Sequence, residues 1–172
     1  MEEKNQKTDL YPPYPFAIIF LRWIFSGATF GWGVYILVDW KDPLAYLYVL
    51  YGVACLTLIL PLSRCIHCYY HGKSCNVGWG KIAGYLFPKE EEAEYQKKYS
   101  YYILTYPLWL FPGLVSFFQL LLKRNLKYLI IFFGFIAIWF LGKLFLKWVC
   151  CGRCHQRDFC PAVPFRGKEK VE

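Results

Sequence analysis

Residues 129–149 read LIIFFGFIAIWFLGKLFLKWV, an apolar run whose two charges, Lys143 and Lys147, lie close to its end. A helix rises about 1.5 Å per residue, so a run of this length crosses the roughly 30 Å hydrocarbon core of a bilayer. A helix on the surface of a soluble domain needs a polar face, and this run has almost none. The stretch therefore predicts a transmembrane helix.

Three further apolar runs precede it, at residues 14–38, 44–62 and 101–122, and Arg22 is the one charge within them. The composition of all 172 residues agrees, with 57% hydrophobic and 19% charged residues. Soluble domains carry about 25% charged residues. The sequence thus predicts an all-α polytopic membrane protein with four transmembrane helices, and it excludes a disordered chain and a conventional soluble enzyme.

The segments between these runs predict an orientation. Short links at 39–43 and 123–128 close two helical hairpins, while a long segment, 63–100, joins the hairpins on the side of both termini. Of the 20 lysine and arginine residues, all lie on that side except Lys41, Lys123, Arg124 and Lys127. Because short cytoplasmic segments carry the basic excess, we expect cytoplasmic termini in a cell-membrane protein. The net charge of +8 then indicates attraction to membrane lipids, not to nucleic acid.

Each hairpin is followed by a cysteine-rich window, and this order indicates a duplication. Two halves with an even number of spans would be parallel two-helix repeats about an axis along the membrane normal, which would put both windows on one face. The alternative is a chance succession of two hairpins. The chain then divides into a first hairpin with its Cys/His cluster (1–76), an interfacial and charged cytoplasmic linker (77–100), and a second hairpin with its cysteine cluster and tail (101–172).

The two windows hold seven of the eight cysteines and all three histidines. Residues 65–75 read CIHCYYHGKSC and residues 150–160 read CCGRCHQRDFC. Each contains Cys-x2-Cys and a further cysteine, and such a short loop lets two thiolates reach one ion. Zinc takes four tetrahedral nitrogen or sulfur ligands, and iron–sulfur clusters take cysteine thiolates. The windows therefore predict a metal site on the cytoplasmic face.

The candidate metal ligands are Cys65, Cys68, His71 and Cys75 in the first window and Cys151, Cys154, His155 and Cys160 in the second, with His67 and Cys150 as substitutes. Either each window closes its own site, or the two Cys-x2-Cys pairs form one four-cysteine site. The long separation along the chain counts against the joint site. The interleaved histidines favour zinc, and the three-cysteine pattern favours an iron–sulfur cluster as the alternative cofactor.

The function that these features favour is not enzymatic, because almost no extramembrane domain remains to hold a substrate pocket. We expect a metal-stabilised structural or docking subunit, with other membrane protein subunits as partners. One alternative is an iron–sulfur electron-transfer subunit. The other is a membrane thiol–disulfide oxidoreductase, which applies if the cysteines face an oxidising compartment.

Smaller features predict local structure. The small-xxx-small pair Gly27 and Gly31 predicts close approach of the first span to another helix. Two prolines, at 107 and 112, predict a bent third span. Arg22 is expected to reach the headgroups or to be a buried charge. The charged run 89–98 predicts a solvated helix without a functional role.

Overall fold

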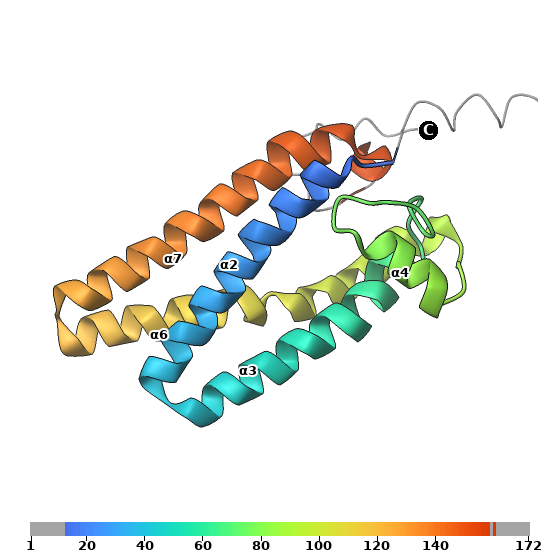
Figure 1. Cartoon of the computed structure of the whole chain (residues 1–172). Helices are drawn as coiled ribbons and strands as arrows, with labels where there is room; N and C mark the ends of the chain where they lie inside the picture. Colours follow the sequence, from blue (N-terminus) through green and yellow to red (C-terminus); the bar gives the residue numbers. More distant parts are fainter. Residues whose placement is uncertain (1–12, 159, 161–172) are drawn as a thin grey trace, which may run out of the picture.

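The computed structural model describes residues 13–158 and 160 and is helical throughout its regular segments (Figure 1). Four of its helical segments are long and apolar enough to cross a membrane: Phe16–Trp40, Asp42–Cys65, Ser100–Lys123 and Leu126–Arg153. Their bounds lie within a few residues of the four predicted runs. The prediction of an all-α chain with four membrane-spanning helices is confirmed.

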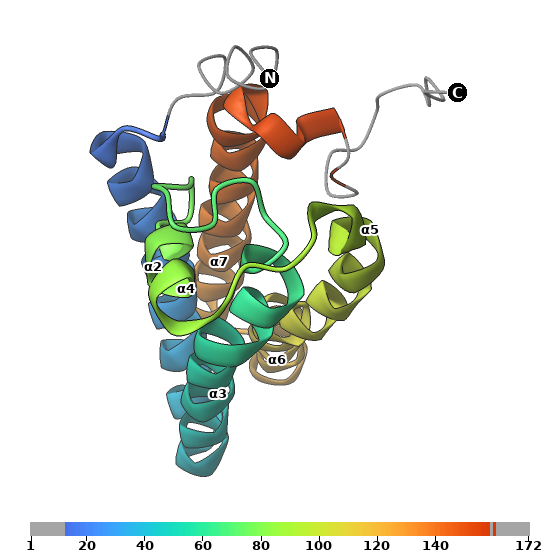
Figure 2. The same ribbon diagram turned by 90° about the vertical axis from the view of Figure 1, so that its right-hand side faces the viewer.

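Helix α2 (Phe16–Trp40) is the central helix of the bundle. It packs against α3 (Asp42–Ala54), α6 (Pro107–Lys123) and α7 (Leu126–Phe145), and α6 also packs against α7. Helix α2 lies between α3 and α7, which make no contact with each other (Figure 1). Figure 2 shows that the segment joining α3 to α6 lies at the same end of the bundle as the C-terminal end of α7. Short turns join α2 to α3 and α6 to α7 at one end of the bundle, so the long connection from α3 to α6 is at the other end.

The second span does not keep α-helical geometry to its end. After α3 it continues through two π-helical turns, Cys55–Ile59 and Pro61–Cys65. Pro61 lacks a backbone N–H, and its ring clashes with the carbonyl four residues earlier in a regular α-helix. In the wider turns, the backbone N–H of Leu60 donates to the Cys55 carbonyl and that of Ile66 donates to the Pro61 carbonyl. The wider turns thus accommodate the proline directly before the first cysteine window.

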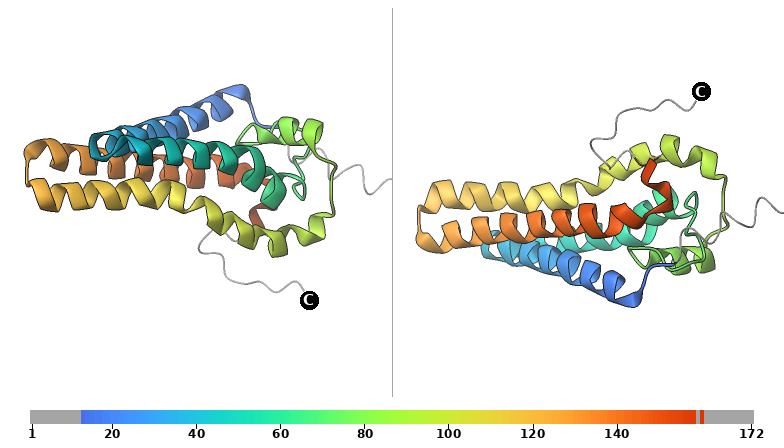
Figure 3. Two further views of the ribbon diagram at one scale, coloured as in Figure 1. Left: turned by 90° about the horizontal axis from the view of Figure 1, so that it is seen from below. Right: turned by 90° about the horizontal axis from the view of Figure 1, so that it is seen from above.

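The third span is bent, as its prolines predict. A 3-10 helix, Tyr99–Thr105, leads into α6, in which Pro107 is the first residue and Pro112 is internal. The chain changes direction where the two segments meet (Figure 3).

Side chains on three helices donate hydrogen bonds to the backbones of neighbouring helices. The Tyr48 hydroxyl donates to the Leu108 carbonyl at 2.9 Å, and the indole N–H of Trp32 donates to the Ile131 carbonyl at 3.2 Å. The amide of Gln119, which is fully buried, donates to the Ile36 carbonyl at 3.3 Å. Hydrogen bonds of this kind associate helices in a bilayer, where apolar surface alone gives little driving force.

The predicted close approach at Gly27 and Gly31 is wrong for contacts within this chain, because a Cβ added at either residue would meet nothing within 4 Å. The close approach occurs instead at Gly33. A Cβ there would lie 2.7 Å from the Tyr48 hydroxyl oxygen and 3.0 Å from Cγ of Pro112. Gly33 therefore sets the separation of α2 from α3 and α6.

Replacing Gly33 with leucine should destabilise the bundle, because both neighbours are buried and fixed in place. Overpacking of this kind costs about 1–3 kcal/mol. We expect Gly33→Leu to lower the thermal unfolding midpoint in detergent, followed by circular dichroism. Gly31→Leu, two residues away on the outward face, is the matched control and should leave the midpoint unchanged. Equal midpoints for the two variants would contradict this packing.

Candidate metal-binding site

Both cysteine windows lie at the same end of the bundle, opposite the two short turns (Figures 1 and 3). The first window follows the π-helical turn Pro61–Cys65, and the second follows another π-helical turn, Leu146–Cys150, at the end of α7. The start of α2 lies at this end as well, since the backbone N–H of Tyr14 donates to the Ser74 carbonyl at 3.0 Å.

Helix α4 (Trp79–Leu86) packs directly on the first window. A Cβ added at Gly80 would lie 2.4 Å from the carbonyl oxygens of Lys73 and Tyr70, and one added at Gly84 would lie 2.6 Å from Cα of Gly72. Only glycine permits this separation. The backbone N–H of Gly80 also donates to the Cys75 sulfur at 3.2 Å. Helix α4 thus fixes the third cysteine of the window.

Six cysteines from the two windows line one cavity of about 390 Å³. They are Cys65, Cys68 and Cys75 from the first window and Cys151, Cys154 and Cys160 from the second. These are the six cysteines predicted first as metal ligands, and Cys150, predicted as a substitute, is not among the residues that line the cavity. All eight cysteines of the chain are free thiols.

The sulfurs share the cavity but are not gathered around one point. Among the described residues, no three cysteine sulfurs lie within 4.8 Å of one another. The Cys160 sulfur is 3.9 Å from the guanidinium of Arg64 and 3.9 Å from the Tyr95 hydroxyl oxygen. Side-chain rotation is therefore needed before four sulfurs could meet at one ion.

Burial and a backbone donor act on the second cysteine of each Cys-x2-Cys pair in the same way. Burial raises the pKa of the Cys68 thiol to about 12, and it also raises the pKa of the Cys154 thiol. In each case a hydrogen bond from the backbone N–H two residues later, at Tyr70 or Gln156, lowers the pKa in part. Both thiols are therefore protonated at neutral pH without a metal, and each has a backbone donor that would stabilise the thiolate once a metal bound.

The cavity wall is basic. Its charged residues are Arg22, Arg64, Lys143, Lys147 and Arg157, and none of the described residues that line it is an aspartate or glutamate. Arg22 lies on α2 and its Nε atom is buried without a hydrogen-bond partner. The Arg22 side chain is half-buried and lines the cavity, so it lies beside the cysteines at this end of the bundle. Cationic side chains here lower the electrostatic cost of collecting several thiolates.

Tyr14 links the two windows. Its backbone N–H bonds to the first window at Ser74, and its hydroxyl donates to the Cys150 carbonyl at 2.6 Å. Its ring packs edge-on against Tyr70 with centroids 5.5 Å apart. The Tyr70 hydroxyl in turn accepts a hydrogen bond from the His155 backbone N–H at 3.3 Å. The relative position of the windows therefore depends on two tyrosines.

The histidines predicted as ligands are placed differently from the cysteines. Nε2 of His71 donates to the Phe87 carbonyl at 3.1 Å, and the His155 ring stacks on Tyr69 with centroids 4.0 Å apart. Neither residue is among those that line the cavity. The cysteine part of the predicted ligand set is brought together, and the histidine part is not.

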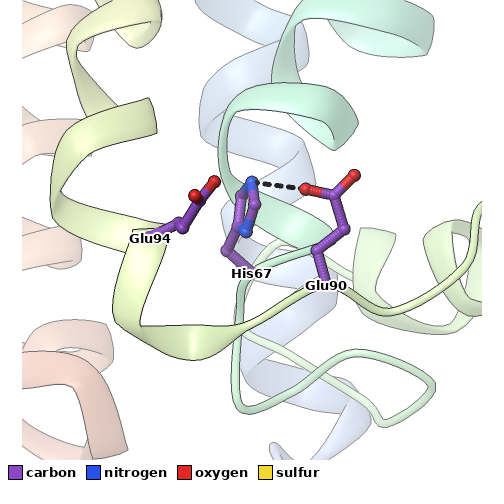
Figure 4. A group of neighbouring side chains, drawn as sticks. All are labelled: His67, Glu90 and Glu94. Carbon is purple, nitrogen blue, oxygen red and sulfur yellow. Dashed lines mark ion pairs between the residues drawn. The ribbon is translucent and has the colours of Figure 1, made fainter.

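One group of possible ligands, which the sequence did not indicate as a set, combines a histidine of the first window with two glutamates of the linker. His67, Glu90 and Glu94 have ligand atoms within 4.8 Å of one another, the one such trio of His, Cys, Asp or Glu among the described residues (Figure 4). The glutamates belong to the charged run 89–98, for which we expected no functional role. No spacing motif joins them to His67, so only the fold reveals the trio.

No protein-family model, curated protein or solved structure matches this chain. The site geometry and the membrane-spanning fold are therefore the basis for inferring a function.

Replacing Tyr14 with phenylalanine should loosen the contact between the windows, because it leaves the Cys150 carbonyl without its donor. An unsatisfied buried acceptor costs roughly 1–3 kcal/mol. We expect a lower thermal midpoint for Tyr14→Phe in detergent. Tyr85→Phe, at a side chain that is 92% exposed, is the control and should behave as the unmodified protein does. An unchanged midpoint for Tyr14→Phe would show that this hydrogen bond does not hold the windows together.

Proposed function

We propose that this chain is an integral membrane protein that binds a metal through cysteines of both windows, and that it serves as a structural or docking subunit of a larger membrane assembly. The observation that carries the proposal is the lining of one cavity by all six predicted cysteine ligands. It favours one site shared by the two windows. The long separation of the windows along the chain is the argument against that arrangement, and the shared cavity outweighs it.

Metal binding would draw the cysteine sulfurs together. A zinc–sulfur bond is about 2.3 Å long, so four sulfurs around one zinc lie about 4 Å apart. No three cysteine sulfurs of the described residues lie within 4.8 Å of one another. The energy of metal binding then contributes to the stability of the folded windows, as it does in small zinc domains. Zinc with four thiolates is anionic, and the five cationic side chains of the wall would balance that charge.

Zinc is the metal we propose first, and an iron–sulfur cluster for electron transfer is the second candidate. The placement of His71 and His155 outside the cavity removes the reason to prefer a mixed Cys/His zinc site over an all-cysteine site. Four cysteine thiolates also form a complete tetrahedral zinc site, so zinc remains the first candidate without the histidines. Iron–sulfur clusters are held by cysteine thiolates alone in most proteins.

The thiol–disulfide oxidoreductase is the least supported reading. An exchange nucleophile needs a lowered pKa so that the thiolate is populated, whereas burial raises the pKa of Cys68 to about 12. The proposed role as a subunit rests on the small amount of described chain outside the spans. The orientation with cytoplasmic termini rests on the asymmetry of lysine and arginine.

Metal content and an absorption spectrum, measured on protein purified anaerobically in detergent, test the proposal. We expect one metal centre per chain, colourless for zinc and brown with acid-labile sulfide for iron. Cys68→Ser and Cys154→Ser should each abolish metal retention, because both windows supply the same centre. Cys55→Ser, at a buried thiol in the second span, is the control and should retain the metal.

Two results would contradict the shared site. Loss of half of the metal in each window variant would show that each window closes its own site. Absence of any metal from the unmodified protein, with all thiols accessible after denaturation, would contradict metal binding. The thiol–disulfide oxidoreductase would then be the favoured function.

A further inference from the structure

His67 lies between Cys65 and Cys68 in the chain, but it does not line the cysteine cavity. Its side chain points toward Glu90 and Glu94, which come from the linker that follows α4 (Figure 4). We propose that His67, Glu90 and Glu94 form a second metal site, separate from the cysteine cavity, that binds a divalent transition-metal ion.

The hydrogen bonding of His67 determines which ring nitrogen is available. Nδ1 is 3.1 Å from the Glu91 carbonyl oxygen, and a carbonyl can only accept, so Nδ1 carries the proton. Nε2 of the neutral ring is then an acceptor. It lies 3.4 Å from a carboxylate oxygen of Glu90, and it is a buried atom without a hydrogen-bond partner. The His67 side chain is 0% exposed. A buried lone pair facing a carboxylate is unfavourable unless a cation lies between them or Nε2 also carries a proton, and the presence of a second carboxylate, Glu94, within 4.8 Å favours the cation.

The same hydrogen bond is the usual support of a metal-binding histidine. Such a residue donates its second ring N–H to a carbonyl or a carboxylate, which fixes both the tautomer and the direction of the ring. In His67 the Glu91 carbonyl fills that role. The orientation of Nε2 is thus set before any ion binds.

The spacing of the three ligand atoms is close to that of one ion's ligands. Bonds of about 2.0–2.2 Å place neighbouring ligands about 3–4 Å apart. The atoms of His67, Glu90 and Glu94 are already within 4.8 Å of one another. Glu90 is half exposed, so its side chain can rotate inward, and water can fill the remaining positions around the ion. The site needs only a small adjustment.

The ligand set selects the class of metal. One imidazole nitrogen with two carboxylates suits Zn²⁺, Fe²⁺, Co²⁺ or Mn²⁺. Mg²⁺ and Ca²⁺ prefer oxygen ligands alone, and Cu⁺ prefers sulfur. The chemistry of this trio therefore differs from that of the thiols in the cavity.

An ion here would join the first window to the linker, at a place that the second window also contacts. The backbone N–H of Glu90 donates to the Ile66 carbonyl at 3.0 Å, so the linker already contacts the first window. The Gln156 amide of the second window donates to the His67 carbonyl at 3.4 Å. Metal binding at His67 would thus fix the backbone between Cys65 and Cys68 and restrict where their sulfurs can move.

Manganese binding to the chelator-washed, full-length protein in detergent tests this site. Mn²⁺ prefers carboxylate and imidazole to thiolate, so it reports on the trio and not on the cysteine cavity. Bound Mn²⁺ is measured by loss of the free-ion signal in electron paramagnetic resonance. We expect one Mn²⁺ per chain, and binding weaker by more than about tenfold in Glu94→Gln and in the double variant Glu90→Gln/Glu94→Gln, since even losing a supporting residue costs that much.

Glu91→Gln is the matched control, because Glu91 lies on the same segment and contributes only its backbone carbonyl. It should bind Mn²⁺ as the unmodified protein does. The competing arrangement is a protonated His67 paired with Glu90 alone, in which Glu94 has no role. Equal Mn²⁺ binding by Glu94→Gln and Glu91→Gln, or no binding by the unmodified protein, would overturn the metal site in favour of that ion pair.

Two further measurements separate loss of binding from loss of folding, and this site from the cysteine cavity. Added Mn²⁺ should raise the thermal midpoint of the unmodified protein and of Glu91→Gln but not that of Glu94→Gln, which also shows whether each variant is folded. Cys154→Ser should still bind Mn²⁺ after losing the metal of the cavity. The two proposals can therefore fail independently.

Discussion

The packing of α2 against three other helices is the constraint on which the site depends. Because α2 contacts α3, α6 and α7, the ends of both hairpins are held around its first residues. Tyr14, two residues before the start of α2, then makes a hydrogen bond to each window. Cysteines that are far apart along the chain share a cavity for this reason. The metal chemistry proposed here is thus a property of the whole bundle, because neither window encloses the cavity alone.

The fold could be predicted from the sequence because the bilayer leaves few choices. A chain in hydrocarbon must satisfy its backbone groups internally, so four long apolar runs are read as four helices. The face that each helix turns to its neighbours was harder to predict. Gly27 and Gly31 fit a motif for close contact, yet the contact is at Gly33. Such a motif identifies small residues but does not say which of them meets a partner.

The cysteines were found from the sequence because soft ligands are rare and were concentrated in two windows. The sequence left one shared site and two separate sites as alternatives, since distance along the chain says little about distance in a bundle. His67 with Glu90 and Glu94 was missed for a related reason. Surface glutamates are common, and only the fold shows that two of them face a buried imidazole. The short stretch from Cys65 to Cys68 thus presents sulfur to the cavity and nitrogen to the linker.

The π-helical turns at Pro61–Cys65 and Leu146–Cys150 have a consequence for how sequence changes act on this protein. A π-helical turn holds about one residue more than an α-helical turn, and each residue of a helix turns the chain by about 100°. The direction in which the cysteine window after such a turn faces therefore depends on the number of residues in the span before it. Deleting one residue near Leu146 would rotate the second window around the axis of its span. The direction of both windows thus depends on helix length. An insertion or deletion within a span can therefore alter a site with which the changed residues make no contact.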